Sequence, residues 1–164
     1  MNGTHWYAVR SKSRCEKVAA EHLSARGFEK FLPLYPTRRR WTDRTKVIDL
    51  PLFSGYVFCR FDSQNVSSVL GAPSVAYVVS FGHGPVGIPD DEIEAIRRVI
   101  ASGLASSPCL YFKEGVKVKI RNGPLVGLTG QLQKARNNPR LVISVEMLQR
   151  SVAVEVDQDD VEAA

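Results

Sequence analysis

Apolar and cationic side chains alternate along residues 116–121, where three aliphatic residues are separated by lysines and followed by an arginine. An alternation with a period of two is typical of a strand with one buried face and one solvent-facing face. Asn122-Gly123-Pro124 predicts a turn, and strand-like apolar segments recur toward the end of the chain. We therefore expect a small β-barrel in the C-terminal third. Its predicted strands are residues 115–121, 130–135, 141–147 and 151–156.

The N-terminal part shows a helical spacing as well. Ser13 and Glu16 match a Ser-x-x-Glu capping box, apolar residues follow every three or four positions, and Gly27 stands where a helix often ends. Residues 63–70 predict a short helix, and the acidic residues after Pro89 predict the start of another. The mixture predicts an α+β domain with an antiparallel sheet flanked by helices. Its predicted strands are residues 6–9, 28–35, 50–61 and 75–81.

A run of small residues separates the two patterns. Residues 102–108 consist mainly of serine, glycine, alanine and proline, which is typical of a linker. We expect the α+β domain over residues 1–101, a linker over 102–112 and an all-β domain over 113–164.

Composition narrows the class of protein. Of the 164 residues, 44% are apolar and 24% are charged, as in ordinary globular domains. No apolar run approaches the roughly 18 residues that a membrane-spanning helix needs. The three cysteines are widely spaced and odd in number, which favours free thiols and a cytoplasmic protein. We expect a monomer with no membrane partner.

Positive charge is concentrated in the first third of the chain. Residues 1–62 carry 12 basic and 6 acidic side chains, a balance of +6, while the whole chain carries +5. Such a distribution fits a nucleic-acid partner. A solvated basic face without a partner explains a bias of this size about equally well.

Five cations surround one tryptophan between residues 38 and 46. A loop or hairpin of this composition can bind phosphates and stack the indole on a base. The alternative is a mobile segment that keeps the protein dissolved, and we favour the binding interpretation. The candidate nucleic-acid residues are Arg38, Arg39, Arg40 and Trp41, with Arg10, Lys12 and Arg14 after the first strand.

The segment 52–61 is unusually aromatic. Two interpretations apply to Tyr56 and Phe58: they fill the core from one face of a central strand, or part of this aromatic surface, with Phe53, is exposed for docking. We give each about equal weight.

The sequence offers little for catalysis. No histidine has Cys, Asp or Glu at the spacing of metal ligands. The glycine-rich segment 82–87 lacks the Lys-Ser/Thr ending of a phosphate loop. We therefore expect a non-enzymatic protein with no cofactor, no metal and no catalytic residue, and we reject an enzyme that uses His83 or Cys59.

Taken in order, these segments resemble the NusG family of transcription elongation factors, which combine an N-terminal NGN domain, a linker and a C-terminal, SH3-like KOW barrel. The resemblance implies a factor that binds RNA polymerase and suppresses pausing or termination. It covers nearly the whole chain. The matching segments are Trp6-Tyr7-Ala8-Val9, Glu16-Lys17-Val18-Ala19, Phe53-Ser54-Gly55-Tyr56-Val57-Phe58, Gly87-Ile88-Pro89, residues 115–130 and residues 152–162.

The resemblance also implies roles for individual residues. A surface that meets the polymerase clamp helices would include Phe53, Tyr56, Phe58 and Phe81. Ser67 and Ser68 would approach the gate loop, and Arg10, Lys12 and Arg14 the non-template DNA strand or nascent RNA. In the KOW domain, Leu125, Leu128 and Ile143 would meet Rho or a ribosomal protein of the small subunit.

Two departures point to a specialised member. The Pro-Gly-Tyr expected in housekeeping members is Ser54-Gly55-Tyr56 here, and the Arg triplet with Trp41 looks more like RfaH and factors tied to polysaccharide operons. We therefore expect an operon-restricted antiterminator. The alternative is a ribosome- or RNA-binding module that acts through Lys117, Lys119 and Arg121 without RNA polymerase.

Overall fold

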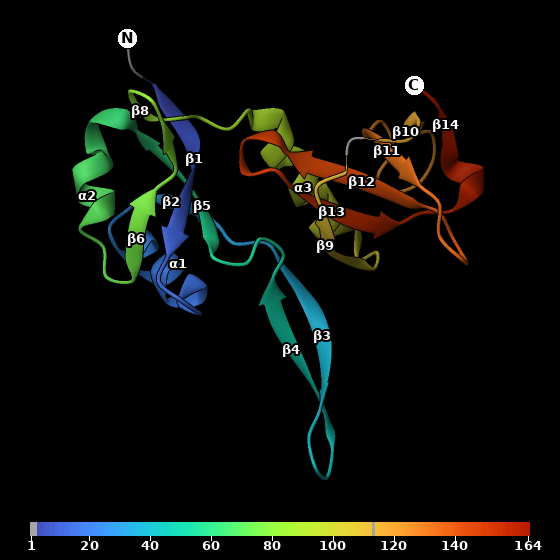
Figure 1. Ribbon diagram of the computed structural model, residues 1–164, viewed down its shortest axis with the longest axis horizontal. Coiled ribbons are helices and arrows are strands. Elements are labelled where there is room, and N and C mark those ends of the chain that lie inside the picture. The colour runs from blue at the N-terminus through green and yellow to red at the C-terminus, as the bar shows by residue number, and fades with distance from the viewer. Residues whose placement is uncertain (1–2, 113) are drawn as a thin grey trace. The chain divides into compact units, whose positions relative to one another are not determined.

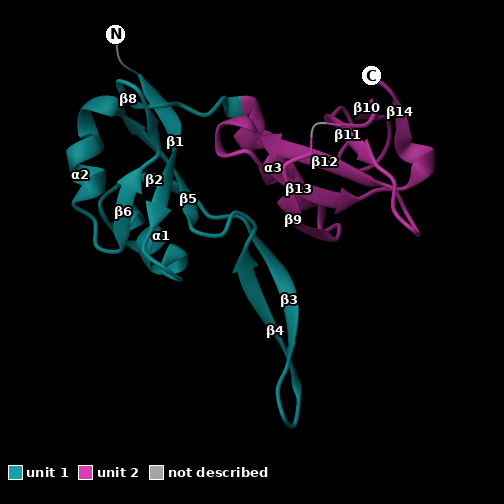
Figure 2. Ribbon diagram, in the orientation of Figure 1, with its two compact units in different colours: residues 1–90 teal, residues 91–164 magenta. Residues whose placement is uncertain are grey.

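The computed structural model describes residues 3–112 and 114–164 and divides the chain into two compact units, residues 1–90 and 91–164 (Figure 2). Every helix in the described residues is too short or too polar to cross a lipid bilayer.

The first unit is built on an antiparallel sheet with strand order β2-β5-β1-β6 (Figure 1). The pairing β1–β5 is the longest, and it sets Ala8 opposite Phe58 and Arg10 opposite Tyr56. The four strands are β1 (Thr4–Ser11), β2 (Glu29–Phe31), β5 (Tyr56–Asp62) and β6 (Val75–Val78).

Helices α1 (Glu16–Ala25) and α2 (Val66–Leu70) supply apolar side chains to the same core as one face of this sheet. Tyr7 and Val9 alternate inward from β1, and Leu23 from α1 meets them there. A one-turn 3₁₀ helix, Ser63–Asn65, precedes α2. Together the two helices cover residues 63–70, where the sequence predicted one short helix.

The two ends of α1 test the capping predictions separately. The C-terminal prediction is confirmed: Gly27 has φ +87°, and the amides of Gly27 and Phe28 donate to the carbonyls of Ser24 and Leu23 at 3.0 and 3.1 Å. The capping box is wrong, because the helix begins after Cys15 without a side-chain cap. The Glu16 carboxylate is used elsewhere.

The segment between β2 and β5 forms a two-stranded hairpin, β3 (Leu34–Arg40) with β4 (Thr45–Pro51), that belongs to no larger sheet. In Figure 1 it extends away from the four-stranded sheet of its unit. The sequence predicted either a loop or a hairpin for this segment, and the structure shows a hairpin. A smaller ribbon, β7 (Ser80–Phe81) with β8 (Gly84–Pro85), follows β6.

The second unit contains helix α3 (Asp90–Ser102) and a six-stranded antiparallel sheet of order β14-β10-β11-β12-β13-β9. All four predicted C-terminal strands are present, and Val118, Ile120 and Leu141 are buried in this unit. The strands are β9 (Ser106–Leu110), β10 (Lys117–Ile120), β11 (Thr129–Gln133), β12 (Arg140–Val145), β13 (Arg150–Glu155) and β14 (Val161–Ala163).

The boundary between the units differs from the expected one. Helix α3 groups with the C-terminal strands, and the expected linker 102–112 contains β9, which pairs with β13. A short strand of small residues with Pro108 carries no alternating pattern, yet proline is tolerated at a sheet edge because that position needs no amide donor. Lys113, the expected start of the all-β domain, lies outside the described residues.

Candidate functional site

The turn before β5 is held in place from two sides. The amide of Gly55 donates to Glu16 Oε2 at 2.9 Å, and its carbonyl accepts from the amide of Ser11 at 2.9 Å. Glu16 is 7% exposed. A buried carboxylate is stable only with good hydrogen-bond partners, so this contact fixes the turn against α1 and β1.

Arg10 lies over the aromatic ring that follows this turn. Its guanidinium carbon is 5.1 Å from the centroid of the Tyr56 ring, within the range of a cation–π interaction. A Cβ at Gly55 would lie 2.2 Å from Arg10 Nη1, and the φ of Gly55 is +89°. The positive φ favours glycine here, and a side chain at this position would displace the Arg10 guanidinium.

Tyr77 completes this surface. The strand register sets Arg10 between Tyr56 on β5 and Tyr77 on β6, so the three side chains share one face of the sheet. Tyr77 is 51% exposed and Tyr56 is half-buried. We call Arg10, Tyr56 and Tyr77 the Arg10 surface. Tyr77 was not among the expected contact residues, although its place next to the inward-facing Val78 signalled an outward ring.

Two of the expected clamp-binding residues are not exposed. Phe53 and Phe58 are 1% and 0% exposed, with ring centroids 5.3 Å apart in an edge-to-face arrangement, and Phe31 stacks on Phe58 at 6.1 Å. The expected exposed patch at Phe53, Tyr56 and Phe58 is therefore wrong for the two phenylalanines. Phe58 lies on the face opposite the α1–α2 core, beside the buried Ala8, so this part of that face is covered as well. Phe81, by contrast, is 60% exposed.

The remaining N-terminal candidates are exposed. Lys12 and Arg14 follow β1, and Arg14 has a left-handed backbone with φ +58°. Ser67 and Ser68 lie on α2, where Arg26 donates to the carbonyl oxygens of Ser68 and Gly71 at 3.3 and 2.9 Å. The two serines therefore sit on a short helix that is tied to α1 by its backbone.

The β3–β4 hairpin presents the cationic cluster. All of its five cations and Trp41 are exposed. The cations of Arg44 and Lys46 lie 5.7 and 5.2 Å from the centroid of the indole ring, so tertiary geometry groups three residues that the sequence only suggested as neighbours.

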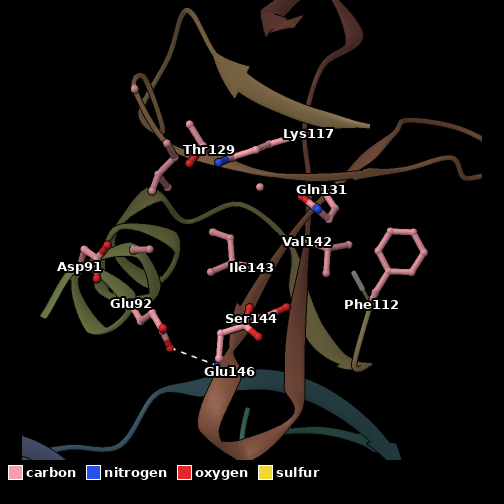
Figure 3. Close-up of a pocket in the computed structure, with 14 residues that line it drawn as sticks. Asp91, Glu92, Phe112, Lys117, Thr129, Gln131, Val142, Ile143, Ser144 and Glu146 are labelled. Atoms are coloured by element: carbon pink, nitrogen blue, oxygen red, sulfur yellow. Dashed lines mark hydrogen bonds between the residues drawn. The ribbon is translucent and has the colours of Figure 1, made fainter. Parts of the chain in front are cut away.

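In the second unit, one of the three expected partner-binding residues is buried in the core and the other two line a cavity. Leu125 is 1% exposed and belongs to the core, so its expected place on an apolar edge is wrong. Ile143 and Leu128 line an open cavity of about 370 Å³, which residues Asp91, Glu92 and Ala95 of α3 also line (Figure 3). Ile143 itself is only 6% exposed.

Hydrogen bonds hold α3 against this part of the sheet. Arg98 Nη2 donates to the carbonyls of Pro124 and Val126 at 3.0 and 2.7 Å, and the amide of Glu146 donates to Glu92 Oε1 at 3.2 Å (Figure 3). Helix α3 therefore covers part of the surface that the resemblance assigns to a partner.

The Cys59 thiol lies in the core of the first unit. Burial raises the pKa of the Cys59 thiol to about 12, and the nearby carboxylate of Glu29 adds to this rise. A thiol with this pKa is protonated at neutral pH and is a poor nucleophile. Among residues 3–112 and 114–164, no three His, Cys, Asp or Glu side chains gather as a metal site would require.

Comparisons with known proteins agree on one family. The family model described as "Transcription termination factor nusG" matches residues 4–97. The chain is 30% identical to the transcription termination/antitermination protein NusG of Escherichia coli K12, over 97% of this chain and 96% of that protein. It is 29% identical to NusG of Thermus thermophilus, over 93% and 94% of the two chains.

Among solved structures, the fold is similar to that of Thermotoga maritima NusG. The TM-score is 0.60 with 23% sequence identity, over 98% of this chain and 97% of that one. At this identity the similarity concerns the fold alone.

Proposed function

Because the chain belongs to the NusG family of transcription termination/antitermination factors, we propose that it binds RNA polymerase through its first unit and suppresses pausing and termination. A factor that binds the elongating conformation better than the paused one shifts the population toward elongation without any chemical step. The polymerase itself supplies the catalysis.

The observation that carries this proposal is the fixed presentation of Tyr56. The turn at Gly55 is held by Ser11 and Glu16, and Arg10 lies over the Tyr56 ring. Tyrosine and arginine are the residues most often found at binding hot spots, and a pre-organised pair loses little entropy on binding. The Arg10 surface together with the exposed Phe81 is our proposed polymerase contact. Phe53 and Phe58 are buried next to this surface: Phe58 follows Tyr56 on the same face of β5, and the two phenylalanine rings pack edge to face.

Polar contacts extend the proposal. Ser67 and Ser68 on α2 are placed to approach a second polymerase element, the gate loop. Lys12 and Arg14, exposed beside the Arg10 surface, fit the phosphates of the non-template DNA strand or of nascent RNA.

We also propose that the factor acts at particular operons. The support is the hairpin with its Arg triplet and Trp41, a cationic element suited to an additional nucleic-acid contact. If the hairpin prefers a particular DNA sequence, the factor would act only on templates that contain this sequence.

The test is binding of the full-length chain to core RNA polymerase. We expect Tyr56→Ala with Phe81→Ala to weaken binding at least about tenfold, the loss expected when hot-spot side chains are truncated. Leu110→Ala is the matched control, because Leu110 is 91% exposed but lies in the second unit.

Pause lifetime in a reconstituted transcription assay is the functional readout. The wild type should shorten pauses, and the double variant, with unchanged circular dichroism, should not. Equal polymerase binding by the wild type and the double variant would contradict the proposed contact.

For the second unit, we propose that it recruits a further partner, Rho or a ribosomal protein of the small subunit, at the surface around Leu128 and Ile143. Because α3 lines the same cavity, a partner bound there would contact or displace α3.

One observation favours a second candidate function, RNA or ribosome binding by the second unit alone. Lys117 and Lys119 are exposed on β10 while Val118 and Ile120 are buried, so a cationic face is present. Arg121 is less available, since its Nε donates to the carbonyl of Asp159 at 2.8 Å. This alternative predicts RNA affinity that survives loss of Tyr56 and Phe81 and disappears with Lys117→Ala/Lys119→Ala.

A further inference from the structure

The β3–β4 hairpin, residues 34–51, is a ribbon of regular geometry. Seven residue pairs are in uninterrupted register, from Leu34 opposite Pro51 to Arg40 opposite Thr45, and the amide of Trp41 donates to the carbonyl of Arg44 at 2.7 Å. Seven residues at roughly 3.3 Å each give an arm of about 23 Å. We call this element the arm.

Charge dominates the outer half of the arm. Residues 38–46 contain five cations and one carboxylate, Asp43, a balance of +4. In the described part of the chain, none of these five cations forms an ion pair with a carboxylate. An exposed cluster of unpaired like charges destabilises the free protein slightly through self-repulsion, so its role lies with an anionic partner.

The register distributes the cations over both faces of the ribbon. Arg39 is opposite Lys46, and Trp41 and Arg44 follow on that same face, as their cation–π geometry requires. Arg38, opposite Val47, and Arg40, opposite Thr45, point to the other face.

We propose that the arm binds double-helical DNA by entering a groove. The inference rests on the proposed function and names the class of nucleic acid that the arm contacts. The major groove of B-DNA is about 12 Å wide and accepts a two-stranded β-ribbon. Between two phosphate walls, cations on both faces of a ribbon find partners, whereas on a flat anionic surface one face would stay unused.

A single strand fits the arm less well. Proteins that bind single strands combine a groove with several stacking platforms. The outer half of the arm carries one aromatic ring, and two cations already lie close to it. At the tip of the arm, the half-exposed indole is placed to contact base edges or wedge at a base step. Double-stranded RNA is disfavoured because the major groove of the A-form is deep and narrow.

The experiment uses the full-length chain with a fluorescein-labelled 20-base-pair DNA duplex, followed by anisotropy at several KCl concentrations. A single strand of the same sequence and the corresponding RNA duplex are the competitors. We expect micromolar affinity at low salt, with a slope of log K against log [salt] of about −4.5 if all five cations meet phosphates. The DNA duplex should bind at least about threefold more tightly than either competitor.

Two double variants test the two faces. Arg38→Ala/Arg40→Ala and Arg39→Ala/Lys46→Ala should each weaken duplex binding about tenfold and reduce the slope by about 1.8. Lys134→Ala/Arg136→Ala is the matched control, because it removes the same charge from exposed positions of the second unit.

An equal loss of duplex affinity in all three double variants would show that binding depends only on net charge, and would overturn the proposal. A loss with only one face would overturn insertion between two phosphate walls. Tighter binding of the single strand or of the RNA duplex would replace double-helical DNA with that ligand.

Intrinsic fluorescence gives a readout at the tip itself. The chain has two tryptophans, and Trp6 is 3% exposed while Trp41 is 48% exposed. Acrylamide therefore quenches mainly Trp41, and duplex DNA should protect it. Trp41→Phe should remove the quenchable signal, and unchanged quenching with saturating duplex would overturn the contact at Trp41.

This test is independent of the polymerase. The arm variants should retain full binding to core RNA polymerase, and Tyr56→Ala/Phe81→Ala should retain duplex binding. Failure of the arm proposal and failure of the polymerase proposal are therefore distinguishable.

Discussion

Gly55 shows how one residue determines the shape of a surface. Its left-handed φ shapes the turn, its amide binds the buried carboxylate of Glu16, and its missing side chain leaves room for the guanidinium of Arg10. Removing any of these features would change how Tyr56 is presented. The sequence predicted that Glu16 caps its own helix, but in the structure its carboxylate accepts a hydrogen bond from Gly55. A glutamate suits both roles, so the sequence alone could not distinguish them.

We predict that Gly55→Ala lowers the free energy of unfolding by more than about 1 kcal/mol, because alanine is strained at a positive φ and its Cβ displaces the Arg10 guanidinium from the Tyr56 ring. Urea denaturation followed by the fluorescence of the buried Trp6, in a Trp41→Phe background, measures this for the first unit. Gly82→Ala is the control: it also has a positive φ, +61°, but a Cβ added there would have nothing within 4 Å. A loss no larger than that of Gly82→Ala would remove the steric part of the explanation.

Cys59 gives a prediction for alkaline pH. The folded protein raises the pKa of this thiol from 9.0 to about 12, so the folded state favours the protonated form. The resulting stabilisation is complete below pH 9 and is lost as the pH rises from 9 toward 12.

The measurement is the free energy of unfolding of the first unit at pH 7, 9 and 10.5, followed by Trp6 fluorescence, for the wild type and Cys59→Ala, both carrying Trp41→Phe. We expect the advantage of the wild type to shrink as the pH rises. Burial also raises the pKa of Tyr7, so the variant should keep some alkaline sensitivity. A difference between the two proteins that does not change with pH would contradict the burial of the thiol.

At the scale of elements, the structure assigns α3 to the C-terminal strands. Its apolar face was predictable, and Ile93, Ile96 and Val99 are buried as the spacing indicates. What it packs against was not predictable, because the bonds from Arg98 reach carbonyls 26 and 28 residues away. Every residue has a backbone carbonyl, so the sequence does not show which carbonyls accept a hydrogen bond from a distant side chain.

We predict that Arg98→Ala loosens α3 from the sheet, since both carbonyl contacts come from this one guanidinium. Hydrogen exchange at the amides of residues 125–128 should become faster by about fivefold, corresponding to roughly 1 kcal/mol for hydrogen bonds from a charged donor. Arg97→Ala, which removes the same charge from the same helix, is the control. Equal exchange in both variants would show that Arg98 does not hold the helix.

At the scale of the whole molecule, each unit has its own hydrophobic core. Tyr7, Val9 and Phe61 belong to the first, and Leu141 and Val154 are fully buried in the second. Two compact units can unfold in separate transitions, and each unit then has its own free energy of unfolding.

We predict that Leu141→Ala destabilises the second unit by about 2–5 kcal/mol, as truncation of a buried leucine usually does. In a Trp41→Phe background, the fluorescence of the buried Trp6 reports on the first unit alone. Its urea midpoint should stay unchanged, while amide exchange in the second unit accelerates. A shift of the Trp6 midpoint would show that the two units unfold together.

Local side-chain patterns were enough to place most elements and to indicate the family. Hydrophobic alternation placed β10 to β13, helical spacing placed α1 and α3, and the order of short motifs indicated the NusG family that the comparisons then showed. Each of these features depends on side chains that are only a few residues apart in the sequence. Gly27 was assigned for the same reason, because a helix end depends on its own last turn.

Exposure and long-range contacts, by contrast, were settled by the folded chain. The fold buried Phe53 and Phe58, gathered Arg10 with Tyr56 and Tyr77, moved Glu16 from a helix cap to Gly55, and made β9 from the expected linker. The physical reason is common to all four. An alternating strand shows which residues share a face, but whether that face meets solvent or another layer depends on segments distant in the chain.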